Sequence, residues 1–274
     1  MSIRTPDIDE QESKPQVHSH CPSEFRIVNE RASDPQYTAP PIIEAVIEFR
    51  FANGLPDADL SKIGKRLKRS YANQLDGQNV EFQFNIEAQH ADFSTKPTIR
   101  LSSEDQADIA VIQQQTLTWS RLAPYLGWDS FIERVRSDAE EVHKIVGPFR
   151  LDRIGVRYIN RIDVPLNKDG GAPYGEYLAI NIDIPESIQS VKNYAWRFEY
   201  QVPDSDLLAI LQSAIVSPEV PNTGAFILDV DVVASQNIPL RIDEIFIKLE
   251  EMRRAKNRFF EMSIRDEARR MFDK

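Results

Sequence analysis

The sequence predicts an α+β fold made of two successive units, each with the element order β-α-β-β-β-α. Three observations support this prediction: segments in which apolar and polar residues alternate, amphipathic helices after the first and last strands of each unit, and a strand-like segment at 149–165 that begins the pattern again. Because most of these strands have one polar face, we expect antiparallel sheets covered by helices on one side. The units are 40–148 and 149–274, and we expect them to form one compact body.

The first unit, residues 40–148, begins with a strand in which apolar residues alternate with charged ones. Alternation of this kind predicts strands at 43–51, 80–87, 98–102 and 109–119. Apolar residues spaced by three and four predict a helix that starts near Asp59 and includes Tyr71 and Leu75. The same spacing predicts a second helix over 128–146, which a Gly-Pro pair ends.

The second unit, residues 149–274, is expected to repeat this order. Strands are predicted at 149–165, 194–202, 207–216 and 226–232. A short helix or a turn is predicted at 174–179, and helices are predicted at 242–259 and near 266–272. The segment 207–216 also fits a helix, but the turn before it and the Ser-Pro pair after it favour a strand. Rings that share one face of the strand at 194–202 are expected in the core: Tyr194, Trp196, Phe198 and Tyr200.

Two motifs and the C-terminal segment carry a resemblance to a known family. They are PPIIEAVIEFRF at 40–51, RIGVRYINRIDVP at 153–165 and NRFFEMSIRDEARRMF at 257–272. Over residues 40–274 the chain resembles a sporadically distributed family of uncharacterised bacterial proteins. The resemblance implies a bacterial origin and, from the sporadic distribution, a stress or phage-defence system, but no activity. At the level of the fold alone, the expected sheet is similar to the saddle-like TATA-binding-protein and helix-grip architectures, which we favour over a closed barrel.

Composition excludes several classes of protein. Of 274 residues, 41% are hydrophobic and 28% charged, as in globular proteins, and no apolar run approaches the roughly 18–20 residues that cross a bilayer. The net charge of −10 argues against nucleic acid or an anionic membrane as a partner. The single cysteine, Cys21, excludes an internal disulfide, and the N-terminus lacks the apolar core of a secretory signal. We therefore expect a cytoplasmic protein.

Residues 1–39 are predicted to be a disordered acidic tail, because they are rich in Asp, Glu, Ser, Gln and Pro and lack apolar periodicity. His18, His20 and Cys21 cluster within it, and such side chains can bind zinc or copper. A structural zinc site needs a fourth ligand, usually from a second ligand pair, and none accompanies them. We therefore predict a solvated tail, with no metal and no cofactor.

Arginines recur on one side of the strand at 149–165, and we call this side the arginine face. Its candidate site residues are Arg153, Arg157 and Arg161, with Arg197 of a later strand and Glu44 and Glu48 of the first strand. The two glutamates are expected to lie opposite Arg157 and Arg161. The face is then either a ladder of cross-strand ion pairs or a groove for a small anionic ligand, since guanidinium groups suit phosphate and carboxylate. Ion pairs are favoured, because enough carboxylates are present to neutralise every arginine.

Signals for catalysis are weak. In a closed barrel, these charges would resemble the tunnel of metal-dependent triphosphatases, where carboxylates hold divalent metal and arginines hold phosphates. Such tunnels begin with alternating Glu-x-Glu-x-Lys, whereas the first strand here contains Glu-xxx-Glu-x-Arg. No GxSxG, P-loop, GxGxxG or HExxH motif occurs, and Asp229 and Asp231 are expected to face solvent rather than bind metal.

The leading hypothesis is therefore a non-enzymatic binding or assembly module, which binds a partner protein or a second copy of itself through the arginine face or an exposed strand edge. The alternative is a phosphate- or nucleotide-binding protein, or a metal-dependent phosphohydrolase, that uses the arginine face. Replacing Arg157 and Arg161 by alanine discriminates between them, because an anion site loses its ligand whereas an ion-pair ladder loses only a little stability.

Overall fold

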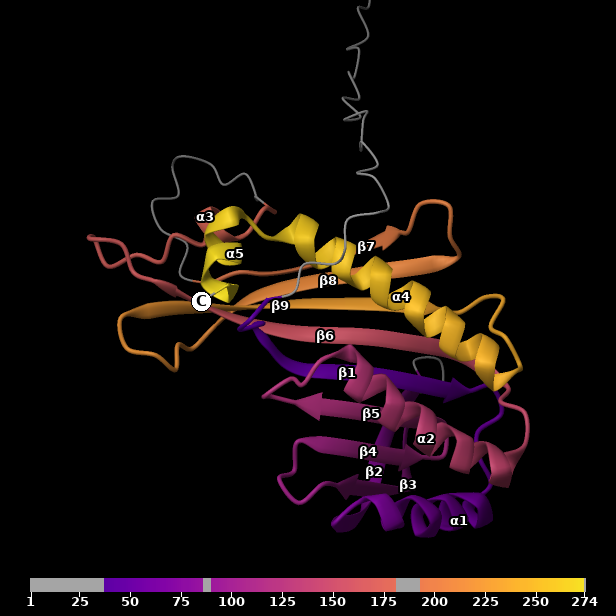
Figure 1. The fold of residues 1–274 in the computed structure, drawn as a ribbon. Coiled ribbons are helices and arrows are strands. Elements are labelled where there is room, and N and C mark those ends of the chain that lie inside the picture. Colours follow the sequence, from indigo (N-terminus) through magenta and orange to yellow (C-terminus); the bar gives the residue numbers. More distant parts are fainter. Residues whose placement is uncertain (1–36, 86–89, 181–192, 274) are drawn as a thin grey trace, which may run out of the picture. The chain divides into compact units, whose positions relative to one another are not determined.

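The structure is a computed structural model, and it describes residues 37–85, 90–180 and 193–273 (Figure 1). The strands are β1 (Ile42–Phe51), β2 (Asn73–Asn85), β3 (His90–Ser102), β4 (Asp108–Gln113), β5 (Thr116–Leu122), β6 (Leu151–Pro165), β7 (Ala195–Gln201), β8 (Leu207–Val216) and β9 (Thr223–Ala234). The helices are α1 (Asp57–Leu67), α2 (Trp128–Val146), α3 (Tyr174–Tyr177), α4 (Ile242–Ser263) and α5 (Asp266–Phe272), with a 3₁₀ turn at Lys68–Ser70.

One sheet runs through the described residues, with nine strands in the order β2-β3-β4-β5-β1-β6-β9-β8-β7. Every neighbouring pair is antiparallel. In each half the last strand, β5 or β9, returns beside the first strand, β1 or β6, and these two first strands pair with each other at the centre. The predicted α+β fold with antiparallel strands is confirmed. Within these residues the sheet is open, with β2 and β7 at its ends, and it does not close into a barrel.

The first half contains one strand more than predicted, because the segment 109–119 is a hairpin instead of a single strand. β4 and β5 pair antiparallel, and Gln114 and Gln115 separate them. Thr116 Oγ1 donates to Gln113 Oε1 at 2.9 Å and closes the turn. The run of three glutamines interrupts the alternation of apolar residues and is the sequence signal of this turn. The second half has the predicted order of elements.

The helix predicted to include Tyr71 and Leu75 ends earlier. α1 stops at Leu67, a 3₁₀ turn follows, and β2 begins at Asn73. Leu75 therefore lies in β2, where it is 67% exposed, whereas Tyr71 is buried and its hydroxyl donates to Asp138 of α2 at 2.6 Å. The prediction was wrong because apolar spacing cannot distinguish the end of a helical stripe from an apolar residue on the strand that follows.

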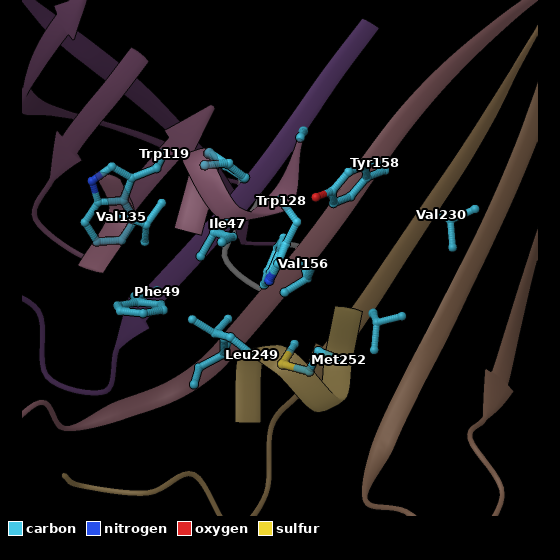
Figure 2. Packing of buried hydrophobic residues seen from close by; sticks show 14 of the residues in the cluster. Ile47, Phe49, Trp119, Trp128, Val135, Val156, Tyr158, Val230, Leu249 and Met252 are labelled. Atoms are coloured by element: carbon cyan, nitrogen blue, oxygen red, sulfur yellow. The ribbon is translucent and has the colours of Figure 1, made fainter. Parts of the chain in front are cut away.

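Helices cover one face of the sheet, and Figure 1 shows α2 in front of β1 and β5 and α4 crossing β9, β8 and β6. The core lies between the two layers. Figure 2 shows part of it, with side chains from both halves: Ile47, Phe49, Trp119, Trp128, Val135, Val156, Tyr158, Val230, Leu249 and Met252. Each large apolar side chain contributes roughly 1.5–3 kcal/mol when it is buried. Because these residues belong to one cluster, the two halves share a core.

Ordered contacts begin before residue 40, the start predicted for the first unit. The Tyr37 hydroxyl donates to Glu261 at 2.7 Å, and its ring meets that of Phe272 edge-on with centroids 5.3 Å apart. Ala39 N donates to the carbonyl oxygen of Phe272 at 2.8 Å. These three contacts attach the segment before β1 to the two C-terminal helices.

The rest of the predicted tail, including His18, His20 and Cys21, lies outside the described residues. The side-chain directions expected in the strand at 80–87 also lie outside them. In the part of the chain that the structure describes, no helix is both long and apolar enough to span a membrane.

Candidate functional site

The arginine face lies on the side of the sheet opposite α2 and α4, at the central strands. In β1 and β6 alternate residues are buried under the helices, so the residues between them point to the other side. These include Glu48 of β1 and the three arginines of β6. β9 adds Asp229 and Asp231, because its register with β6 sets Arg157 opposite Asp231.

Arg153 connects three strands of this face. Its Nη1 donates to Glu48 Oε1 on β1, and its Nη2 donates to Asp231 Oδ2 on β9 at 3.0 Å. A β-carbon on Gly155 would lie 3.2 Å from Nη1, which is tighter than most such contacts. Glycine at this position therefore leaves room for the guanidinium group to bridge the two carboxylates.

Arg157 holds Asp229 through a two-point contact. Its Nε donates to Oδ1 at 2.9 Å and its Nη2 donates to Oδ2 at 2.6 Å. Such bidentate pairs are among the stronger ionic interactions. Gln212 of β8 donates to the same carboxylate at 3.3 Å. The hydrogen bonds to Asp229 are the main reason why the pKa of Arg157 is raised.

The other two predicted arginines have partners on their own strands. Arg161 donates from Nε to Asp163 Oδ2 at 2.8 Å and lies 3.0 Å from a carboxylate oxygen of Glu219. The hydrogen bond to Asp163 raises the pKa of Arg161. Arg197 belongs to β7, three strands away from β6, and pairs with Glu199 at 2.7 Å.

The structure brings some of the predicted residues together and separates others. Glu48 contacts Arg153 and not the arginines expected opposite it. Glu44 lies near enough to Arg157 for its charge to raise the pKa of that arginine, while Arg197 lies apart from this group. Each predicted arginine has at least one carboxylate partner. The arrangement is therefore a set of ion pairs with little positive charge left for an anion.

Asp229 and Asp231 are buried, so the prediction that they face solvent is wrong. They are 5% and 9% exposed, respectively, beside the arginines that they bind. Among the described residues, Asp231 Oδ1 has no hydrogen-bond partner. Burial raises the pKa of Asp231 to about 6 and outweighs the charges of Arg153 and Arg157, which act in the opposite direction. The arginine face thus contains a carboxylate whose pKa lies above the usual range of an aspartate.

A second surface, which we call the aromatic edge, lies on β7 and comprises Trp196, Phe198 and Tyr200. The prediction that these rings belong to the core is wrong for two of them, since Phe198 is 36% and Tyr200 is 43% exposed. β7 is the last strand of the described sheet, and α4 packs over β9, β6 and β8 (Figure 1). Alternation shows which residues share a face but not whether another layer covers that face, so the sequence carried no signal for this surface.

The rings of the aromatic edge form a row along β7. Ring centroids are 4.9 Å apart for Trp196 and Phe198 and 6.1 Å apart for Phe198 and Tyr200. Tyr200 also stacks on Phe259 of α4, with centroids 6.1 Å apart. Tyr194, which precedes the strand, is half-buried and packs on Tyr174. One end of the row is therefore anchored to α4, while Phe198 and Tyr200 remain exposed.

The backbone N–H and C=O groups of successive β7 residues point alternately toward β8 and away from it. Val202 N donates to Leu207 O at 2.9 Å, and Ile215 N donates to Tyr194 O at 3.2 Å. Hydrogen-bonded pairs recur at every second residue of an antiparallel ladder, so the three residues of the aromatic edge also bond to β8. The residues whose N–H and C=O groups point away from β8 are Ala195, Arg197, Glu199 and Gln201.

The chain matches no protein-family model and no curated protein. Over the residues whose positions are described, no group of three or more His, Cys, Asp or Glu side chains is arranged to hold a metal ion.

Proposed function

We propose that this chain is a non-enzymatic protein-binding or assembly module, and that it binds its partner through the aromatic edge. One observation carries this proposal: on β7, exposed aromatic rings occur together with backbone N–H and C=O groups that point away from β8 at the edge of the sheet. An edge strand offers its N–H and C=O groups to a strand of another chain, and adjacent apolar side chains add specific contacts. Aromatic residues are also enriched at the centres of protein interfaces.

The arginine face gives less support to the alternative, a phosphate- or nucleotide-binding protein or a phosphohydrolase. An incoming anion would have to displace Glu48, Asp229 or Asp163 from the arginines that they bind. Displacing Asp229 would leave a buried carboxylate unpaired, at a cost of about 2–3 kcal/mol for a pair whose arginine is partly exposed. We therefore assign the arginine face a role in stability.

We also propose that the module works in the cytoplasm of a bacterium. A chain with one cysteine suits a reducing compartment. The resemblance of three segments to a sporadically distributed bacterial family supports the bacterial origin and a place in a stress or phage-defence system.

Native mass spectrometry of the protein, purified gently from its own host, tests the proposal with two variants. Phe198→Asp places a charge in the middle of the aromatic edge. Ile247→Asp is the matched control, since Ile247 is 71% exposed on α4 and lies about 18 Å along the helix from Phe259. We expect the wild type and the control to carry a bound polypeptide, and Phe198→Asp to lose at least about tenfold in affinity for it.

Equal binding by the two variants would contradict the proposal. A bound mass of a few hundred daltons (about the size of a nucleotide) that persists in Phe198→Asp and disappears in Arg157→Ala would favour the anion-binding alternative.

A further inference from the structure

We infer that the partner of the aromatic edge is a second copy of this chain, paired antiparallel with the first across a two-fold axis at Phe198. This inference rests on the proposed function and specifies its partner. It follows from the order of residues along β7, Ala-Trp-Arg-Phe-Glu-Tyr-Gln, which complements itself when a second copy runs in the opposite direction. A contact of this kind uses the same surface on both copies.

With Phe198 at the axis, charges of opposite sign meet. Arg197 lies opposite Glu199 of the second copy, and Glu199 lies opposite Arg197 of the second copy. Moving the axis by one residue sets Arg197 against Arg197 or Glu199 against Glu199, and like charges directly opposite each other destabilise a strand pair. Moving it by two residues sets Arg197 against Ala195 or Glu199 against Gln201, so the opposite pairs are lost. Charge therefore selects the register centred on Phe198.

The backbone of β7 fits the same register. The N–H and C=O groups of Arg197 and Glu199 point away from β8, so each residue can exchange two hydrogen bonds with the residue opposite it. Phe198 and its copy then form the intervening pair without hydrogen bonds, in which Cα atoms are about 4.5 Å apart and side chains lie closest. The phase of the hydrogen bonds and the order of the charges therefore require the same pairing.

The apolar side of β7 is also complementary to itself. A two-fold axis perpendicular to the sheet keeps the rings of both copies on the side that carries the helices. Trp196 then faces Tyr200 of the second copy on each side of the central Phe198 pair, and cross-strand aromatic pairs stabilise a sheet. Since Phe259 of α4 already stacks on Tyr200, the rings of the second copy extend an existing stack and cover the exposed Phe198 and Tyr200.

Sedimentation velocity of the purified full-length chain tests the inference through charge reversal. The wild type is expected at twice the monomer mass of 31.4 kDa. Arg197→Glu or Glu199→Arg alone turns both opposite pairs into like pairs and should weaken the dimer at least about tenfold. The double variant Arg197→Glu/Glu199→Arg restores opposite pairs and should dimerise again. An equimolar mixture of the two single variants should form a heterodimer, because an acidic edge then meets a basic one.

The reversed variants are expected to remain folded. Arg197 and Glu199 are 47% and 51% exposed, and such an exposed ion pair within one chain contributes little to stability. Circular dichroism and the urea midpoint check this. Hydrogen exchange gives a second readout of the contact, since the outward amides of β7 should be protected in the wild type and exchange rapidly in each single variant.

Three results would overturn the inference. A wild type that stays at 31.4 kDa at every concentration excludes a second copy as the partner. If the outward amides of β7 are protected in that monomer, another segment of the same chain covers the edge. A dimer that is insensitive to both single reversals uses a different surface. Single variants that dissociate but do not combine on mixing exclude the Phe198 register. The proposed function itself survives these results if the monomer binds another protein that Phe198→Asp releases.

Discussion

Asp231 is a residue at which burial outweighs favourable charges. Its Oδ2 accepts a hydrogen bond from Arg153 at 3.0 Å, and Arg157 supplies a second positive charge nearby. Burial nevertheless raises its pKa to about 6, and in the described part of the chain Oδ1 gains no hydrogen bond to replace those of water. An aspartate in an unfolded chain has a pKa of about 3.9. The folded protein therefore binds this proton more tightly than the unfolded chain does.

Replacing Asp231 by asparagine should remove a pH dependence of stability between about pH 4 and pH 6. In this window the folded wild type keeps a proton that the unfolded chain has lost. The stabilisation is present at the acidic end and is lost as the pH rises through the folded pKa. The free energy of unfolding of the wild type minus that of Asp231→Asn should therefore fall by roughly 2–3 kcal/mol across the window. Urea denaturation measures this difference; a constant or rising difference would contradict the raised pKa.

The ion pair of Arg157 and Asp229 should contribute more than an exposed pair of the same kind. Arg157→Ala leaves a buried carboxylate without its closest donors and should cost about 2–3 kcal/mol, less than a wholly buried pair because the arginine is partly exposed. Arg50→Ala is the matched control and should cost less than about 1 kcal/mol. The side chains of Arg50 and Arg157 are each 43% exposed, whereas the side chains of their partners Asp152 and Asp229 are 44% and 7% exposed. Equal losses in urea denaturation would mean that burial of the carboxylate has no effect.

At the scale of elements, a buried polar cluster joins α2 to the turn after α1 and to β5. Asp138 of α2 is 2% exposed and accepts hydrogen bonds from Tyr71 at 2.6 Å and from Trp119 of β5 at 3.0 Å. Arg134, one helical turn earlier, donates to the Tyr71 hydroxyl at 2.8 Å. Burial is the main reason why the pKa values of Asp138 and Tyr71 are both raised. The cluster fixes the position of the chain between α1 and β2.

Tyr71→Phe should lower the free energy of unfolding by about 1–3 kcal/mol, because it removes a donor to Asp138 and an acceptor for Arg134. A double-mutant cycle with Asp138→Ala, which removes the acceptor, tests whether the loss comes from the shared hydrogen bond. The sum of the losses in the two single variants should differ from the loss in the double variant by about 1 kcal/mol or more. Losses that add within about 0.5 kcal/mol would show that the two side chains act independently.

Sequence periodicity predicts the interiors of elements better than their ends. α2 spans the predicted range, because its apolar stripe is continuous and Gly147, with a φ of 73°, ends it. The prediction missed two ends of elements, namely the end of α1 and the turn between β4 and β5. The end of α1 depends on the contact of Tyr71 with α2, whereas the turn between β4 and β5 is marked in the sequence only by the short run of three glutamines.

The arginine face is predictable as a row of residues but not as a set of pairs. Alternation places Arg153, Arg157 and Arg161 on one side of β6, as observed. Their partners depend on register, which includes a shift between β1 and β6 and brings Asp229 and Asp231 from β9. The aromatic edge is harder still to predict from the sequence, because its exposure to solvent depends on where α4 crosses the sheet.

For the whole folded unit, the pairing of β1 with β6 makes the two halves one body. The two strands pair antiparallel along their length at the centre of the sheet, and Ile47 and Val156 beside each other are fully buried. α2 of the first half also contacts α4 of the second. Because the core is shared, the two halves should unfold together.

Leu228→Ala tests this cooperativity. Leu228 lies in β9 and is 0% exposed, so its truncation should cost about 2–5 kcal/mol. In hydrogen exchange followed by mass spectrometry, the slowest amides of β1 and β5 should then accelerate by the same factor as those of β6 and β8. Acceleration confined to the second half would show that the halves unfold separately.

The aromatic edge also supplies an optical signal. The sequence contains three tryptophans; Trp119 and Trp128 are 1% and 8% exposed, whereas Trp196 is half-buried on β7. Indole emission moves to shorter wavelength and becomes harder to quench with acrylamide when water is removed from the ring. Any strand that docks on β7 should therefore change the quenchable part of the emission, so its affinity can be titrated by intrinsic fluorescence in the unlabelled protein.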